Sequence, residues 1–204
     1  MVNHNRILRK EQQPILKLVQ MAMLAAISLV LVLLVRFPLI QAAPFLVYDM
    51  ADIPILLGGM MFGPLAGMSI LLVVSLVQAF FLGGDGWYGF VMHMVASGVL
   101  VLVASLFYRV KRRFVFGVIG MLLGSLGMAL VMIPMNLVLT PLYMGVPREV
   151  VLSMLLPAII PFNLLKAGIN CVVTAILFRA LFPFFRRFYW MFGDDVLGNK
   201  TNID

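Results

Sequence analysis

A few polar side chains interrupt the long apolar stretches of this sequence, and these are the residues that could do chemistry. Asn163, Lys166 and Asn170 are spaced i, i+3 and i+7, which puts one ammonium and two amides on one face of a helix. Such groups are costly inside a membrane span and are candidates for function. Together they can hydrogen-bond a ligand. The alternative for Lys166 is an ammonium that reaches the lipid headgroups.

Three more polar residues, Gln78, His93 and Asn136, fall in apolar runs. We expect them to contact a ligand, although Gln78 and Asn136 could instead form interhelical hydrogen bonds. A lone histidine is often a packing residue, and that alternative stays open for His93. With no second His or Cys nearby, a metal site lacks its ligands.

The composition excludes a soluble protein and predicts a membrane protein of one compact domain. Of the 204 residues, 63% are hydrophobic and 11% charged, and the mean hydropathy is +1.10. Globular proteins have roughly a quarter charged residues. The net charge of +7 is explained by cytoplasmic loops and the anionic inner leaflet, so no nucleic-acid partner is expected. The single cysteine, Cys171, is interpreted as a packing residue.

Three clusters of basic residues indicate the topology, because short loops rich in Lys and Arg stay in the cytoplasm. The clusters are Arg6, Arg9, Lys10 and Lys17; Arg109, Lys111, Arg112 and Arg113; and Arg186 with Arg187. An even number of crossings must separate them. The uncharged segment 53–82 would be about 45 Å long as one helix, against a hydrocarbon core of roughly 30 Å. With Gly63 and Pro64 at its middle, it is predicted to form two short helices.

These arguments predict an all-α membrane protein with six transmembrane helices and cytoplasmic N- and C-termini. The expected helices are about 15–35, 53–62, 65–82, 88–108, 114–139 and 162–183. A cytoplasmic segment (1–14) precedes the membrane domain (15–185), and a cytoplasmic tail (186–204) follows it. The outer connections run from Arg36 to Asp52, from Gly83 to Trp87 and from Thr140 to Pro161. The last contains the apolar run Val150 to Leu156, which is expected to form a short covering helix or flap. All six polar residues then lie within roughly 12 Å of the outer boundary, so the ligand is expected from outside.

The outer loops add aromatic and flexible residues around this polar cluster. They are Phe45, Tyr48, Asp49 and Asp52 in the first loop, and Gly84, Asp85, Trp87 and Tyr88 in and after the second. The aromatic rings could stack on a flat ligand or simply form the interfacial belt. The glycine-rich run 83–86 lacks a following lysine and a preceding strand, so it is a tight turn and not a phosphate-binding loop.

The first helix carries Ala22 and Ala26, four residues apart. Small residues at this spacing let another helix approach closely in lipid, where packing drives association. Ordinary use of alanine in a helix is the alternative.

Two stretches of the sequence resemble a known family. Tyr48 to Gly59, with its Asp-Ile-Pro, and Met61 to Gly67, Met-Phe-Gly-Pro-Leu-Ala-Gly, resemble the second and third helices of S components, the substrate-binding subunits of energy-coupling factor (ECF) vitamin transporters. The run Pro161 to Lys166, Pro-Phe-Asn-Leu-Leu-Lys, is similar to the sixth-helix motif of the riboflavin-specific members. The resemblance covers about residues 18–183.

This resemblance implies a six-helix fold in the plasma membrane of a prokaryote and a protein that is not an enzyme. It implies riboflavin capture from outside by Asn163, Lys166 and Asn136, with no cofactor. It also implies docking through Ala22 and Ala26 to a membrane coupling subunit that works with two ATPases. The chain has no Gly-x-x-x-x-Gly-Lys-Ser/Thr motif, so ATP hydrolysis is expected from these partners.

Three alternatives remain at this stage. The substrate could be another vitamin or precursor, such as pantothenate, folate or a queuosine precursor, although an anionic vitamin would favour more than one buried cation. An intramembrane hydrolase would need a nucleophile and a base, for which only His93 and Ser97 are spaced i, i+4. A purely structural subunit would leave the polar cluster unexplained.

Overall fold

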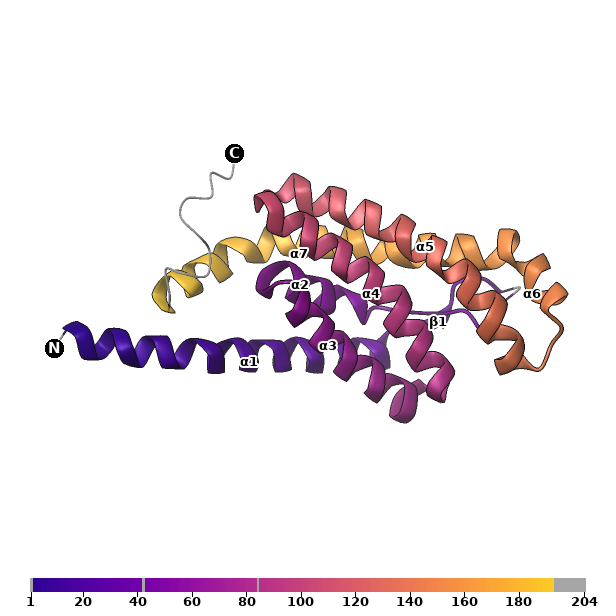
Figure 1. Cartoon of the computed structure of the whole chain (residues 1–204), viewed down its shortest axis with the longest axis horizontal. Coiled ribbons are helices and arrows are strands. Elements are labelled where there is room, and N and C mark those ends of the chain that lie inside the picture. Colours follow the sequence, from indigo (N-terminus) through magenta and orange to yellow (C-terminus); the bar gives the residue numbers. More distant parts are fainter. Residues whose placement is uncertain (1, 42, 84, 193–204) are drawn as a thin grey trace.

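The computed structural model describes residues 2–41, 43–83 and 85–192. Gly84, one of the predicted site residues, lies outside this part of the chain. The elements are α1 (Val2–Leu34), β1 (Arg36–Pro38), β2 (Val47–Asp49), α2 (Asp52–Phe62), α3 (Pro64–Val77), the π-helical turn η1 (Gln78–Gly83), α4 (Gly86–Lys111), α5 (Phe114–Met144), α6 (Arg148–Met154), the π-helical turn η2 (Leu155–Ile159) and α7 (Ile160–Phe192). Figure 1 shows them as one elongated helical bundle.

The predicted class, an all-α membrane protein with six spans, is confirmed. Within the described residues, five helical stretches are long and apolar enough to cross a membrane, and α2 is a shorter apolar helix. The five are Pro14–Leu34, Pro64–Gly83, Gly86–Lys111, Phe114–Met144 and Arg148–Leu181. The small hairpin of β1 and β2 is an addition that the sequence did not predict.

The predicted division of segment 53–82 is also observed. α2 ends at Phe62 and α3 begins at Pro64, with Gly63 between them at a φ of +99°. Only glycine adopts such a backbone readily, and a proline suits the first position of a helix. The two helices then pack closely, because a Cβ added at Gly67 would lie 2.7 Å from the Cα of Gly59.

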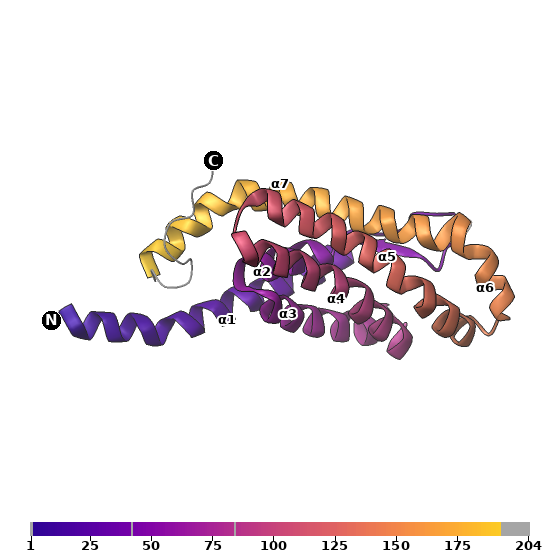
Figure 2. The same ribbon diagram turned by 45° about the horizontal axis from the view of Figure 1, so that its top comes forward.

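α2 lies in the interior of the bundle. Its residues from Asp52 to Met60 are all buried, and it packs against α1, α3, α4 and α7. In Figures 1 and 2 this short helix is enclosed by the longer ones. The start of α2 therefore brings Asp52 into the protein and away from lipid.

The first outer connection forms an antiparallel hairpin. Arg36 pairs with Asp49, Phe37 with Tyr48, and Pro38 with Val47. Leu46 and Tyr48 of the hairpin pack with Val151 of α6 and neighbouring residues of η2 and α7 in a second apolar cluster. This packing fixes the strand that leads into α2.

The long outer connection expected from Thr140 to Pro161 is wrong, because most of it is helical. α5 continues through Pro134 and Pro141 to Met144, where Gly145 ends it with a φ of +66°. Membrane helices tolerate proline because neighbouring groups and local π-helical adjustments satisfy the freed backbone. Pro157 accordingly lies within η2. The short helix expected near residues 150–156 is present as α6.

The start of α1 and the last turns of α7 project from the same end of the bundle, and α6 lies at the opposite end (Figures 1 and 2). This arrangement agrees with an even number of crossings. α1 begins at Val2 and so includes most of the predicted N-terminal segment, and α7 extends to Phe192. The cytoplasmic location of both ends stays a prediction.

The topology can be tested by labelling. We expect a cysteine at Lys111, introduced with Cys171→Ala, to resist a membrane-impermeant maleimide in intact cells, because the 109–113 cluster should be cytoplasmic. A cysteine at Arg148, exposed at the other end, should react. Reaction at position 111 from outside would contradict the orientation.

Candidate functional site

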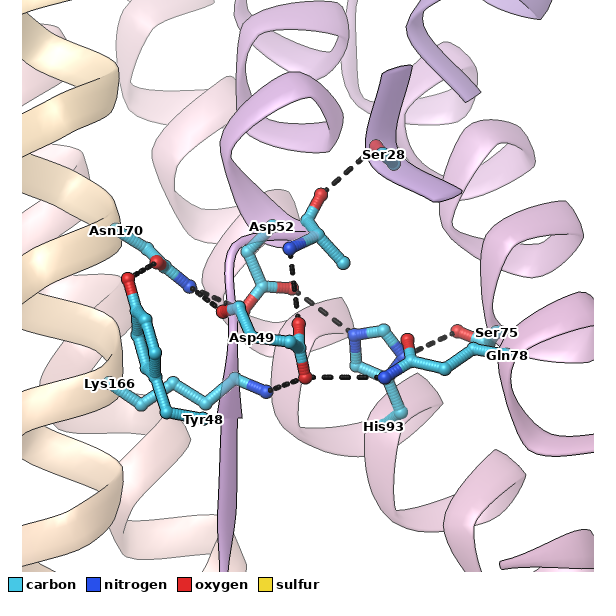
Figure 3. A network of polar contacts seen from close by, with 10 residues as sticks. Ser28, Tyr48, Asp49, Asp52, Ser75, Gln78, His93, Lys166 and Asn170 are labelled. Atoms are coloured by element: carbon cyan, nitrogen blue, oxygen red, sulfur yellow. Dashed lines mark hydrogen bonds and ion pairs between the residues drawn. The ribbon is translucent and has the colours of Figure 1, made fainter. Parts of the chain in front are cut away.

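A network of buried polar side chains joins the hairpin to α3, η1, α4 and α7, and its centre is Asp49 (Figure 3). Lys166 Nζ donates to Asp49 Oδ2 at 2.9 Å, and Gln78 Nε2 donates to the same oxygen at 3.2 Å. The other oxygen, Oδ1, accepts from the backbone N–H of Ala51 at 3.1 Å. One carboxylate thus holds three elements together.

Asp52 is the second buried carboxylate of the network. Its Oδ1 lies 3.2 Å from His93 Nε2, and its Oδ2 accepts from Asn170 Nδ2, also at 3.2 Å. The other ring nitrogen of His93, Nδ1, lies 3.1 Å from the Ser75 hydroxyl. Asp52 therefore connects α2 to both α4 and α7.

Asn170 joins the two halves of the network. Its Oδ1 accepts from the Tyr48 hydroxyl at 2.9 Å, while its Nδ2 also approaches the backbone oxygen of Asp49 at 3.5 Å. The Ser28 hydroxyl donates to the backbone oxygen of Ala51 at 3.0 Å and ties α1 to the same turn. The start of α2 is therefore fixed from several sides.

Local sequence explains why these groups meet. Asp49 ends β2, and its side chain closes a turn on the N–H two residues later, as aspartate commonly does. Asp52 then begins α2, where a negative charge is favoured by the helix dipole. On α7, Lys166 and Asn170 are four residues apart and share a face.

Burial makes the pairing of these charges obligatory. Asp49 is 3% exposed, Asp52 0% and Lys166 8%. An unpaired charge in such surroundings costs several kcal/mol, on the order of the penalty for breaking a buried ion pair. Burial by itself favours the neutral acid at Asp49, but the neighbouring groups, with the Lys166 ammonium foremost, together outweigh it and hold the pKa of this carboxyl below its ordinary value. A carboxylate and an ammonium are therefore present together.

The structure brings five of the predicted site residues into this network: Tyr48, Gln78, His93, Lys166 and Asn170. Lys166 does not extend to the headgroups, since its ammonium is buried against Asp49. Their role in binding stays a prediction.

Two predicted site residues instead hydrogen-bond to backbone oxygens of their own helical segments. Asn136 Nδ2 donates to the backbone oxygen of Met132 at 2.8 Å, and Asn163 Nδ2 donates to that of Ile159 at 2.8 Å. The Thr140 hydroxyl donates to Asn136 Oδ1 at 2.9 Å. Both asparagines are buried, so they face the protein, but among the described residues neither is hydrogen-bonded to Asp49 or Asp52.

The remaining predicted residues are partly or fully exposed. Trp87 is exposed and packs edge-on against Phe80 and Phe90. The ring of Tyr88 lies 5.6 Å from that of Tyr143. These contacts agree with an interfacial belt and equally leave the exposed rings free to meet a ligand.

Asp85 and Phe45 complete the predicted set. Asp85 is 3.7 Å from Arg36 and accepts from the Tyr143 hydroxyl at 3.2 Å. Arg36 also donates to the backbone oxygen of Leu82 at 2.7 Å. Phe45 is partly buried against the second apolar cluster, which contains Leu46 and Tyr48. Asp85 thus links the hairpin to the end of α5.

Asp49 and Asp52 were predicted only as outer-loop residues around the polar cluster, because they precede the apolar run of α2, and Ser75 was not predicted at all. One signal was available: a lysine buried in a span needs a counter-ion, and these are the acidic residues at the matching depth. Ser75 gave no comparable signal.

The hydrolase alternative gains no support from this geometry. Both ring nitrogens of His93 are engaged, one by Asp52 and the other by Ser75. Among the contacts of the described residues, His93 is not paired with Ser97, so the base and nucleophile that this reaction needs are not brought together.

The comparisons with known proteins agree with this fold. A family model described as "ECF transporter, substrate-specific component" matches residues 16–178. The chain is 31% identical over 192 residues to the riboflavin transporter RibU of Staphylococcus aureus (strain TCH60), covering 91% of this chain and 100% of that protein. It is 27% identical over 176 residues to the riboflavin transporter FmnP of Bacillus subtilis (strain 168), covering 82% and 92%.

A solved structure of the S component of a bacterial ECF transporter matches with a TM-score of 0.73 and 32% identity, over 84% of this chain and 98% of that one. The chain therefore belongs to the substrate-specific, or S, components of ECF transporters. It is a multi-pass membrane protein of a bacterium.

The buried network should dominate the stability of this end of the bundle. We expect Asp52→Ala to lower the free energy of unfolding in detergent by about 3–5 kcal/mol, because its partners stay buried without a carboxylate. Asp85→Ala breaks a pair whose side chains are 29% and 44% exposed, so it should cost about 0–1 kcal/mol. Denaturant titration followed by circular dichroism measures both, and similar small losses would contradict the assigned role of Asp52.

Proposed function

We propose that this S component captures riboflavin from outside the cell for uptake driven by partner subunits. The observation that carries the proposal is the polar face of α7, where Lys166 and Asn170 lie buried beside Gln78 at the outer end of the bundle. The relatives described above, which are riboflavin transporters by name, support riboflavin as the substrate. The chain carries no cofactor of its own in this proposal, and riboflavin is its cargo.

The chemistry of this face suits a flavin ring, which offers carbonyl oxygens and an imide N–H. Lys166 uses one of its three donors on Asp49 and can give the others to carbonyl oxygens. Gln78 Oε1 is a buried acceptor without a hydrogen-bond partner among the described residues. A buried unsatisfied group calls for an explanation, and a ligand N–H supplies one.

Other vitamins fit this face less well. Pantothenate and folate are anionic and would require a cation that is free to pair with them. The ammonium of Lys166 already has a carboxylate at 2.9 Å. A queuosine precursor is a further candidate, and the relatives named as riboflavin transporters favour riboflavin over it.

Delivery into the cell requires partners, and α1 supplies the surface. Ala22 and Ala26 are exposed on α1, whereas Ala25 and Ser28 face the bundle. We propose that a membrane coupling subunit docks on the exposed alanines and that two ATPases bound to it hydrolyse ATP. The family description supports association with other ECF components.

Riboflavin titration tests the substrate. We expect Lys166→Ala and Asn163→Ala each to weaken binding about five- to 150-fold, since a lost hydrogen bond strands a polar ligand atom at about 1–3 kcal/mol. Lys17→Ala, an exposed lysine of α1, should leave the affinity unchanged. Unchanged affinity in Lys166→Ala would remove this lysine from the site, and no binding by the parent chain would contradict riboflavin as the substrate.

Uptake and binding should separate when the docking surface is changed. We expect Ala22→Leu or Ala26→Leu to abolish uptake in cells that have the coupling subunit, because a larger side chain prevents close helix approach. Riboflavin binding to the purified variant should remain, since both alanines face away from the network. Met23→Leu, exposed on the same helix but not one of the small residues, is the control. Equal loss of binding and uptake would place the alanines in the fold's own packing.

A further inference from the structure

The charge of Lys166 is already neutralised inside the protein. Its Nζ lies 2.9 Å from Asp49 Oδ2, and the two side chains are 10% and 5% exposed. At this distance and burial the lysine is a hydrogen-bond donor whose positive charge is compensated. A ligand that reaches it therefore meets a pair and not a free cation.

The other charged groups of the network do not restore a positive field. Asp52 adds a second carboxylate, and His93 faces it from α4. Gln78 of η1, Ser75 of α3 and Asn170 of α7 complete the contacts and are uncharged. With His93 neutral the formal charge of the network is −1, and with His93 protonated it is zero.

We propose that Asp49 sets the charge preference of this site, so that the protein takes an uncharged flavin and discriminates against the same flavin carrying a phosphate. The inference rests on the proposed function. Riboflavin has no charged group, whereas its 5′-phosphate carries about −1.5 to −2 at neutral pH, as other phosphate monoesters do. Asp49 acts here through Lys166 and the local field.

Asp49 is assigned this role in preference to Asp52 because of their different partners. Asp52 Oδ1 and Oδ2 are occupied by His93 and Asn170, and it begins α2. Asp49 is the acid that contacts the lysine of the α7 face. Replacing the Asp49 carboxylate with an amide of the same shape therefore removes the charge that pairs directly with Lys166 and makes the network one unit more positive.

The expected size of the change in flavin affinity follows from Coulomb's law. A single charge about 10 Å from a phosphate, at an effective dielectric constant of about 20, changes the affinity by about tenfold or more. The quantity to measure is the ratio of the two affinities, riboflavin over riboflavin 5′-phosphate. A purely structural loss weakens both ligands together and leaves this ratio unchanged.

The test is a charge cycle on the full chain in detergent, with both flavins titrated by fluorescence at low ionic strength. Asp49→Asn should shift the ratio about tenfold toward the phosphate. Lys166→Gln should shift it in the opposite direction, and the double variant should return close to the parent. Glu149→Gln, which removes an exposed carboxylate of α6, is the matched control and should leave the ratio unchanged.

Each outcome decides the matter. If Asp49→Asn does not fold, the shift in Lys166→Gln and its return in the double variant carry the same information. An unchanged ratio across the cycle, with riboflavin still bound by the parent, would overturn the charge preference and leave the proposed function standing. Failure of the parent to bind riboflavin would overturn the proposed function and this inference with it.

Discussion

The ion pair between Lys166 and Asp49 is the constraint on which the rest of this site depends. A lysine can stay buried at the end of a transmembrane helix only if an anion meets it there. The hairpin supplies that anion, and its register puts Asp49 opposite Arg36 at the end of β2. The turn that follows, the start of α2 and the amide of Gln78 are all fixed by the same carboxylate.

The bundle makes this pairing possible because α2 is short and enclosed. Close packing of Gly59 against Gly67 lets α2 and α3 fold back on each other in the interior. The N-terminus of α2 therefore opens inside the protein, at the level of the polar face of α7. In a single long helix through both segments, Asp52 would not lie at the level of the polar face of α7.

The fold separates the buried polar network from the exposed face of α1. The polar network joins the hairpin, α2, α3, η1, α4 and α7 through side-chain hydrogen bonds. α1 contacts this region through Ser28, while Ala22 and Ala26 stay exposed on its other side. The exposed side of α1 can thus be changed without disturbing the network.

The sequence alone determined the membrane class, the six spans, the break at Gly63 and Pro64, the polar stripe of α7 and the family, because all of these depend on local periodicity, length and short motifs.

Tertiary structure decided which acidic residue is the counter-ion of Lys166. Lys166 and Asp49 are 117 residues apart, and only packing shows which acid reaches which base. It also turned Asn136 and Asn163 onto their own helices, where a nearby backbone oxygen satisfies each amide. The prolines after residue 140 did not end the helices, since inside the bundle neighbouring groups and π-helical turns replace the hydrogen bonds that proline removes.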